Sequence, residues 1–258
     1  MTRRRFIADT WTNTTATLTG DQAAHLARVL RAVPGQVYDI VSNGFLHRAE
    51  VTNVSEQRVD FLLHEELSSD AGLPLHLLLA VFKFDRMEWA IEKATELGIA
   101  RITPILARRT EKHLAQSALK RAERWRRIAL EASKQSRRTD VPEIADPIAL
   151  KQALEQENSP TRILLSETEQ TTTLTAALER CKTGCPTACP EPVEGSELSD
   201  VGSRITHAVA IGPEGGWTPE EMSLFAQHQW QPVTLGPRIL RAETAAIAAI
   251  AIASTCLT

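Results

Sequence analysis

The chain has 258 residues, 43% of them hydrophobic, and a formal net charge of −3. This length exceeds that of a typical single domain, so two domains with packed cores are expected. The longest apolar segment, residues 244–257, is shorter than the roughly 20 residues that a membrane span needs, and we expect a buried helix there. Arg3–Arg5 lead into Phe6-Ile7-Ala8-Asp9, which lacks the apolar run of a secretory signal. These features favour a soluble cytoplasmic protein with no membrane partner.

The first part of the chain has the pattern of a small β-rich domain. Thr19-Gly20-Asp21 precedes a short apolar-periodic run and predicts a capped helix. Asn43-Gly44 is the strongest short hairpin signal and lies between two strand-like runs. A further run alternates before an acidic linker that ends near Pro74. The three runs are residues 37–42, 46–51 and 58–63. Residues 1–72 are therefore predicted to form a β-barrel domain.

From residue 75 onward, strands alternate with helices. Predicted strands lie at residues 75–82, 101–106, 162–165, 205–211 and 233–235, and predicted helices at 86–98, 119–137, after Thr218, and 244–257. Thr218 is a good N-cap, Pro219 suits the first turn and Glu221 completes a capping box. Alternation of this kind is typical of α/β proteins with a mostly parallel sheet. Residues 73–258 are predicted to be such a domain.

Two glycine turns predict a ligand site in this second domain. Gly212-Pro213-Glu214-Gly215-Gly216-Trp217 follows one predicted strand, and Gly236-Pro237-Arg238-Ile239-Leu240-Arg241 follows the next. Glycine lets the backbone approach a ligand closely and adopt positive φ. Ligands of open α/β sheets bind at the carboxyl ends of the strands, where these turns are expected to lie.

The basic residues are concentrated in one part of an acidic chain. Residues 108–138 hold eleven basic and three acidic side chains. In the helix predicted there, Ala118, Ala122, Trp125, Ala129 and Ala132 form an apolar stripe, and Lys120, Arg124, Arg127, Lys134 and Arg138 recur on the opposite side. A solvated surface helix would explain this pattern, but the charge excess favours contact with a polyanion such as RNA.

Cysteines do not favour a metal centre. Cys181, Cys185 and Cys189 lie in a predicted flexible insertion, residues 181–203, and Cys256 lies far from them in sequence. Zinc motifs use paired short spacings, so a loop of reduced thiols is the preferred interpretation over a metal or cluster site. The chain also has no phosphate loop or dinucleotide-binding glycine motif, which argues against nucleotide hydrolysis.

Several segments taken together resemble one family. They are Lys83-Phe84-Asp85-Arg86-Met87-Glu88, Glu92-Lys93-Ala94-Thr95-Glu96-Leu97-Gly98, Glu131-Ala132-Ser133-Lys134-Gln135-Ser136-Arg137-Arg138 with Val141-Pro142, and both glycine turns. In order and spacing they resemble the RsmE family, the 16S ribosomal RNA uridine-N3 methyltransferases of the SPOUT superfamily. The resemblance covers nearly the whole chain outside 181–202. It implies a PUA-like N-terminal barrel, a C-terminal SPOUT domain with a trefoil knot, S-adenosylmethionine as methyl donor, a homodimer, and 16S rRNA of the 30S subunit as partner.

The resemblance also implies the cofactor site, whereas the catalytic candidates follow from residue chemistry and the RNA candidates from charge position and, in part, from the family match. Cofactor contacts are expected from three loops, through Leu165, Ser166, Glu167, Ile211, Gly212, Pro213, Gly215, Gly216, Leu235, Gly236, Ile239, Leu240, Arg241, Thr244 and Ala245. Arg241 and Glu243 are the candidates for catalysis, a cation and a carboxylate beside the uracil; a structural ion pair between them is the competing interpretation. Candidate RNA contacts are Arg3, Arg4, Arg28, Arg31, Lys83, Arg86, Arg109, Lys134, Arg137 and Arg138.

Three other functions stay open at this point. The fold would equally serve a SPOUT methyltransferase for a ribose 2′-hydroxyl or for transfer RNA. A non-catalytic RNA-binding factor in ribosome assembly would keep the pocket only as a relic, against which the intact glycines argue. A metal protein built on the three loop cysteines would contain bound zinc or a coloured cluster.

Overall fold

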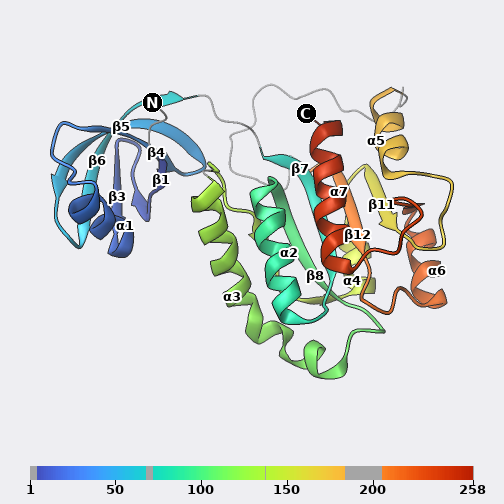
Figure 1. The fold of residues 1–258 in the computed structure, drawn as a ribbon. Helices are drawn as coiled ribbons and strands as arrows, with labels where there is room; N and C mark the ends of the chain where they lie inside the picture. Colours follow the sequence, from blue (N-terminus) through green and yellow to red (C-terminus); the bar gives the residue numbers. More distant parts are fainter. Residues whose placement is uncertain (1–4, 68–71, 137, 184–204, 258) are drawn as a thin grey trace. The chain divides into compact units, whose positions relative to one another are not determined.

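The structure is a computed structural model that describes residues 5–67, 72–136, 138–183 and 205–257. Residues 1–71 together with 133–141 make one compact unit, and residues 72–132 with 142–258 make the other (Figure 1). Within the described residues, no helix is both long enough and apolar enough to cross a membrane.

The first unit is built on one curled, six-stranded sheet. Its strands are β1 (Arg5–Ile7), β2 (Thr10–Trp11), β3 (Thr15–Thr19), β4 (Val37–Ser42), β5 (Phe45–Val54) and β6 (Arg58–Leu67), in the order β1-β4-β5-β6-β3-β2. Register shifts between the two longest strands, β5 and β6, bend the sheet around a core that contains Leu18, Ile40 and Phe61. Because the sheet keeps two edges, it is a half-barrel, and the predicted barrel is confirmed only in part.

Local sequence signals in this unit have different outcomes. The hairpin is confirmed, since Asn43 and Gly44 both have positive φ, 52° and 80°, and connect β4 to β5. The predicted helix exists as α1 (Gly20–Ala24), which continues as a π-helical turn, η1 (His25–Val29). The predicted cap is wrong, because the Thr19 hydroxyl donates to Asp9 Oδ2 at 3.0 Å and makes no capping bond.

The second unit is a three-layer α/β domain. Its strands are β7 (Leu73–Ala80), β8 (Ile99–Leu106), β9 (Glu143–Ile144), β10 (Ile148–Ala149), β11 (Thr161–Leu165), β12 (His207–Ile211) and β13 (Gln231–Val233), all paired in parallel. The sheet order is β10-β8-β7-β12-β11-β13, with β9 beside β8. The helices are α2 (Phe84–Glu96), α3 (Lys112–Ser136), α4 (Leu150–Gln156), α5 (Leu174–Thr183), α6 (Pro219–Gln227) and α7 (Ala242–Leu257).

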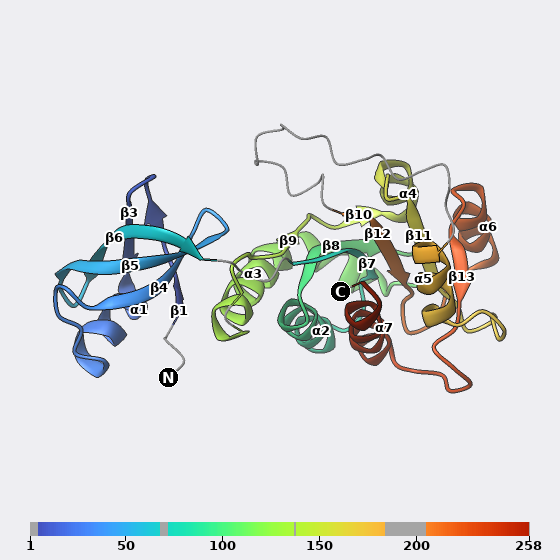
Figure 2. The same ribbon diagram turned by 90° about the horizontal axis from the view of Figure 1, so that it is seen from above.

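The helices cover both faces of this sheet. Side chains of α2, α3, α5 and α7 share one core with the sheet, and side chains of α4 and α6 share the core on the opposite face. Figure 2 shows α2 and α7 side by side on one face and α4 on the other. The final Ala/Ile-rich segment is α7, whose Ala246, Ala249 and Ile250 are fully buried. The α/β prediction for this part of the chain is confirmed.

Most predicted element boundaries in this unit are shifted by a few residues, and that of the long helix by more. β7 begins at Leu73, close to the predicted end of the linker near Pro74, and Pro74 lies at a register shift between β7 and β8. The long helix begins at Lys112, well before residue 119. The predicted insertion at 181–203 starts within α5, and Cys185 and Cys189 lie outside the described residues. In the described ranges, no group of His, Cys, Asp and Glu is arranged to hold a metal.

Candidate functional site

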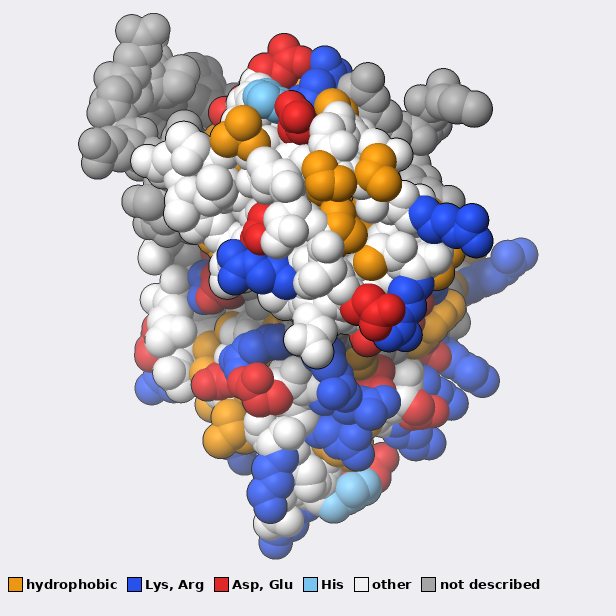
Figure 3. Space-filling view, turned by 90° about the vertical axis from the view of Figure 1, so that its left-hand side faces the viewer, with side chains coloured by type: hydrophobic (Ala, Val, Ile, Leu, Met, Phe, Trp, Pro, Cys, Tyr) orange, Lys and Arg blue, Asp and Glu red, His pale blue; other side chains and the backbone are white. Residues whose placement is uncertain are grey.

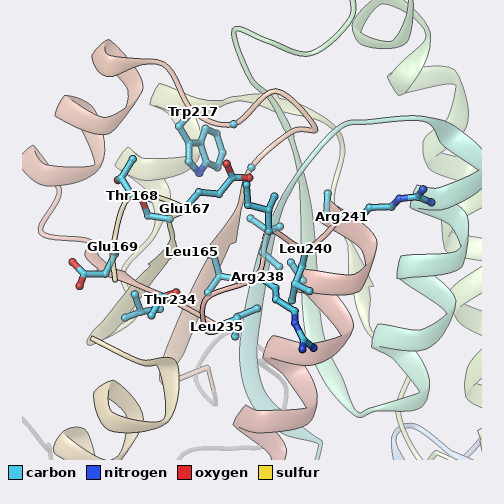
Figure 4. A pocket seen from close by; sticks show the side chains of 18 of the residues that line it. Leu165, Glu167, Thr168, Glu169, Trp217, Thr234, Leu235, Arg238, Leu240 and Arg241 are labelled. Atoms are coloured by element: carbon cyan, nitrogen blue, oxygen red, sulfur yellow. The ribbon is translucent and has the colours of Figure 1, made fainter. Parts of the chain in front are cut away.

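A pocket of about 1000 Å³ lies at the carboxyl ends of β11, β12 and β13. Three connecting segments form it: residues 165–170 after β11, 211–217 after β12 and 233–242 after β13. Figure 4 shows Leu165, Leu235 and Leu240 at its centre, with Trp217 and Thr168 on one side. Apolar walls with surrounding backbone polar groups suit a ligand that has an aromatic base.

The predicted cofactor residues converge on this pocket. Every one of them lines it except Thr244, whose exposed side chain lies in the first turn of α7 outside the lining. Their assignment to a cofactor stays a prediction. Most lining residues that the prediction omitted belong to the same three segments, among them Trp217, Thr234 and Arg238. Met222 of α6 is different, because only the packing of that helix brings it to the pocket, and no local pattern marks it.

The segment after β11 is held by its own side chains. The Glu169 carboxylate accepts bonds from the backbone N–H of Thr171 at 2.8 Å and of Thr172 at 2.9 Å, and from the Thr171 hydroxyl at 2.5 Å. These bonds lower the pKa of Glu169 to about 2, so it is ionised at neutral pH. The Ser166 and Thr168 oxygens lie 2.9 Å apart. This wall of the pocket is therefore a fixed turn with an anionic edge.

The first glycine turn requires glycine for two different reasons. A Cβ on Gly212 would lie 3.1 Å from Trp217 Nε1, and the Trp217 ring packs against Phe225 with centroids 4.8 Å apart. A Cβ on Gly215 would lie 3.3 Å from Arg109 Cδ. Gly216 has a φ of 70°, which disfavours other residues. Tight contact and backbone conformation thus explain the sequence of this turn.

The capping box of α6 is confirmed and does more than cap. The Thr218 side chain accepts from the Glu221 backbone N–H at 3.3 Å, and Glu221 Oε2 accepts from the Thr218 N–H at 2.8 Å. Glu221 is only 3% exposed, and its other oxygen accepts from the backbone N–H of Arg108 at 2.7 Å. One buried carboxylate therefore connects the first glycine turn to the segment that follows β8.

The second glycine turn is organised by Thr234. Its hydroxyl accepts from the Gly236 N–H and donates to the Gly236 carbonyl, both at 3.1 Å. Gly236 has a φ of 118°, and Ile239 further along the turn is 79% exposed. This turn presents backbone groups and an apolar side chain at the mouth of the pocket.

Two arginines predicted to contact RNA are bonded to the first glycine turn. Arg86 Nη1 lies 2.5 Å from Glu214 Oε1, and Arg109 Nη1 donates to the Gly215 carbonyl at 2.5 Å. Both arginines line the pocket. Arg86 Nε also lies 3.8 Å from Oε1 of Glu243 in the first turn of α7.

The two predicted catalytic residues are not brought together. Arg241 is exposed and lines the pocket, whereas Glu243 is 5% exposed and lies outside the lining. Among the described residues, Glu243 pairs with Arg86 and makes no ion pair with Arg241, so the structural ion pair considered from sequence is wrong. Glu243 Oε2 is buried without a hydrogen-bond partner.

The other predicted RNA contacts are scattered. Lys83 is exposed at the start of α2, Arg28 is exposed and paired with Glu56, and Arg31 has a φ of 52°. Lys134 is half-buried. Arg3, Arg4 and Arg137 lie outside the described residues.

The basic face predicted for α3 is present but interrupted. Figure 3 shows Lys and Arg side chains gathered over α3 with acidic ones among them. Lys120 and Arg127 are exposed, while Arg124 donates to both Glu88 oxygens at 2.7 and 2.8 Å. Arg138 departs from the prediction, because it is 9% exposed and its Nη2 bonds Asp140 Oδ2 at 2.7 Å, so it does not extend this face.

The fold and the pocket define an α/β domain with a pocket at the carboxyl edge of a parallel sheet. Residues 69–254 match the family described as RNA methyltransferase domain. A ribosomal RNA small subunit methyltransferase E from Synechocystis is 33% identical over 92% of this chain and 72% of its own length. The Bacillus subtilis protein of the same name is 32% identical over 92% of this chain and 88% of its own. The chain belongs to the ribosomal RNA small subunit methyltransferase E family, which confirms the resemblance to RsmE.

A solved structure from this family is similar over nearly the whole chain. The Neisseria gonorrhoeae ribosomal RNA small subunit methyltransferase E, bound to S-adenosyl methionine, has a TM-score of 0.71 and 29% identity. The similarity covers 97% of this chain and 96% of that one.

Proposed function

We propose that this protein is an S-adenosylmethionine-dependent methyltransferase that methylates N3 of a uridine in the 16S rRNA of the 30S subunit. The observation that carries the proposal is the convergence of three chain segments on one pocket in a chain of this family. The cofactor bound by the gonococcal relative supports the choice of methyl donor.

The residues of the pocket fit this cofactor. Leu165, Leu235 and Leu240 supply apolar walls for an adenine ring. Gly236 leaves backbone groups open to hydrogen-bond the polar edges of that ring, since it has no side chain and nothing lies within 4 Å of where a Cβ would be. When bound, S-adenosylmethionine supplies a methyl group on a positively charged sulfur, ready for in-line displacement. The task that falls to the protein is to align the uracil and to ease loss of its N3 proton.

Arg241 is the pocket residue best suited to that second task. As N3 loses its proton, negative charge spreads to the neighbouring carbonyl oxygens, and a nearby guanidinium stabilises it. Arg241 is exposed, lines the pocket and has no ion-pair partner within the described residues. Glu243 is buried outside the lining, so we assign acceptance of the proton to water admitted by the open pocket rather than to Glu243.

Further parts of the proposal concern organisation. We propose that residues 1–72 are a PUA-like module that anchors RNA, and that residues 73–258 are a SPOUT domain whose chain forms a trefoil knot. The protein is proposed to act as a homodimer, and in the cytoplasm because its proposed substrate is there. The curled sheet of the first unit and the parallel sheet of the second support this division.

Transfer of tritium from labelled S-adenosylmethionine to 30S subunits, taken from cells that lack their own enzyme, tests the proposal. The RNA is digested and the labelled nucleoside identified, with 3-methyluridine expected. Label in a ribose-methylated nucleoside, or in transfer RNA alone, would show a different target. Cofactor binding without transfer to any RNA would favour a non-catalytic assembly factor. Bound zinc in the purified protein, or the visible absorbance of a metal cluster, together with no cofactor binding, would favour the metal-protein alternative.

A further inference from the structure

Arg86 is the residue at which three elements of the pocket region meet. It is part of α2, it bonds Glu214 in the turn after β12, and it faces Glu243 at the start of α7. Resting on the proposed function, we propose that Arg86 is a positioning residue that fixes these two segments in the shape that binds S-adenosylmethionine. This role replaces the RNA contact expected from sequence.

The place of Arg86 in its helix supports this assignment. It lies in the first turn of α2, where the helix dipole disfavours a cation. Carboxylates that face it from other elements offset that cost. The side chains of Arg86 and Glu214 are 31% and 35% exposed, so solvent screens their attraction less than it screens a fully exposed pair.

Glu243 gives the second line of evidence. Its side chain is 6% exposed, and a buried carboxylate is costly unless a cation or hydrogen-bond donors face it. Among the described residues, Arg86 is the one cation within 4.0 Å of it, and its other oxygen has no hydrogen-bond partner. Loss of Arg86 would therefore leave a buried charge unpaired at the start of α7. Three residues that line the pocket lie within two positions of Glu243 in the sequence: Arg241, Ala242 and Ala245.

The same turn is held at two consecutive residues. Arg86 holds the Glu214 side chain, and Arg109 holds the Gly215 carbonyl. Glycine at 215 and 216 makes this stretch intrinsically flexible, so external bonds set its position. Nε and Nη1 of Arg86 both face carboxylates of the protein itself, which favours a positioning role for this side chain.

The test compares Arg86→Ala with Arg124→Ala. Each substitution removes an arginine from an ion pair that includes a residue of α2: Arg86 lies in α2 itself, and Arg124 of α3 binds Glu88 of α2. The two differ because Arg86 lines the pocket and Arg124 does not. Isothermal titration with S-adenosylhomocysteine is expected to show affinity about tenfold weaker for Arg86→Ala and unchanged for Arg124→Ala. Arg86→Lys keeps the positive charge but loses the planar guanidinium with its several N–H donors. Its affinity for S-adenosylhomocysteine should lie between those of Arg86→Ala and wild type.

Steady-state kinetics separates positioning from RNA binding. Arg86→Ala should raise KM for S-adenosylmethionine and leave both KM and filter-binding affinity for 30S subunits unchanged. Reduced 30S affinity with normal S-adenosylhomocysteine affinity would overturn the inference, as would equal effects of the Arg86 and Arg124 substitutions.

Two measurements keep the result interpretable. If Arg86→Ala does not fold, Glu214→Gln removes the same ion pair from its other side and should weaken S-adenosylhomocysteine binding; unchanged affinity would contradict the proposal. Wild-type protein that binds no S-adenosylhomocysteine would overturn the proposed function itself. Normal wild-type binding with unaffected variants would overturn only the role of Arg86.

Discussion

His76 and Glu157, 81 residues apart in the chain, form a buried hydrogen-bonded pair through His76 Nδ1 and Glu157 Oε2. The other ring nitrogen of His76 lies 2.7 Å from the Thr103 hydroxyl, and Glu157 Oε1 accepts from the Ser159 N–H at 2.8 Å. This network joins β7, β8 and the residues that follow α4. It contributes to the fold and is separate from the pocket.

The network predicts acid sensitivity. Burial opposes ionisation of Glu157, but bonds with His76 and Ser159 outweigh it and lower its pKa to about 2 from an ordinary 4.5. A depressed carboxyl pKa stabilises the fold above pH 4.5, and this contribution is lost as pH falls from 4.5 toward 2. Glu157→Gln should therefore reduce the free energy of unfolding by about 2 kcal/mol at pH 7, with a smaller difference at pH 3.

Urea unfolding at both pH values measures this effect. Glu155→Gln is the matched control, because Glu155 is exposed and its i,i+4 ion pair with Lys151 is long, at 3.9 Å. This substitution should change the free energy of unfolding little. A destabilisation by Glu157→Gln that is the same at pH 3 and pH 7 would show that ionisation of Glu157 does not stabilise the fold.

Gly212→Ala is expected to damage the pocket through Trp217. The added methyl group would lie 3.1 Å from Trp217 Nε1, so the indole or the turn must give way slightly, and Phe225 packs against the indole. Overpacking of this kind costs about 1–3 kcal/mol, and we expect S-adenosylhomocysteine affinity to fall about tenfold. Calorimetry measures the affinity, and the fluorescence of the variant reports displaced tryptophan.

Gly215→Ala is the comparison for that variant. Its Cβ would meet the flexible Arg109 side chain at 3.3 Å, which moves more easily than a packed indole. Gly215→Ala should therefore lower the affinity for S-adenosylhomocysteine less than Gly212→Ala does. The reverse order would refute the assignment of Gly212 to close packing with Trp217.

Arg241→Ala should slow chemistry more than binding. If Arg241 stabilises negative charge that develops on the uracil, its removal lowers the single-turnover rate by about 100-fold and leaves S-adenosylhomocysteine affinity within twofold. Arg238→Ala is the control, since Arg238 is also exposed and lines the pocket on the same turn. Equal loss of rate and cofactor affinity in Arg241→Ala would remove the catalytic assignment.

The exposed cations of α3 predict salt-dependent RNA binding. Lys120→Ala and Arg127→Ala should each weaken binding to 30S subunits and reduce the slope of log affinity against log salt by about 1. Arg124→Ala should leave the slope unchanged, because Arg124 is bonded to both oxygens of Glu88. Filter binding across a salt series measures this. Identical slopes for all three variants and wild type would exclude α3 as an RNA-binding surface.

Local patterns in the sequence determined much of this protein. The Asn43-Gly44 hairpin, the Thr218 capping box and the buried stripe that includes Trp125 each depend on residues close together in the chain, so periodicity and turn chemistry predict them. Glycine turns after parallel strands predicted the pocket for the same reason, because strand direction alone places such turns at one edge of a sheet.

Only the tertiary structure decided which distant side chains are partners. Charge and position suggested RNA contacts for Arg86 and Arg109, but the fold turns both toward residues more than 100 positions away, Glu214 and Gly215. Likewise, Arg241 and Glu243 are two residues apart, yet Arg241 is exposed and lines the pocket, whereas Glu243 is buried outside the lining. Pairing across long loops depends on how elements pack, and residue type and spacing carry no information about that packing.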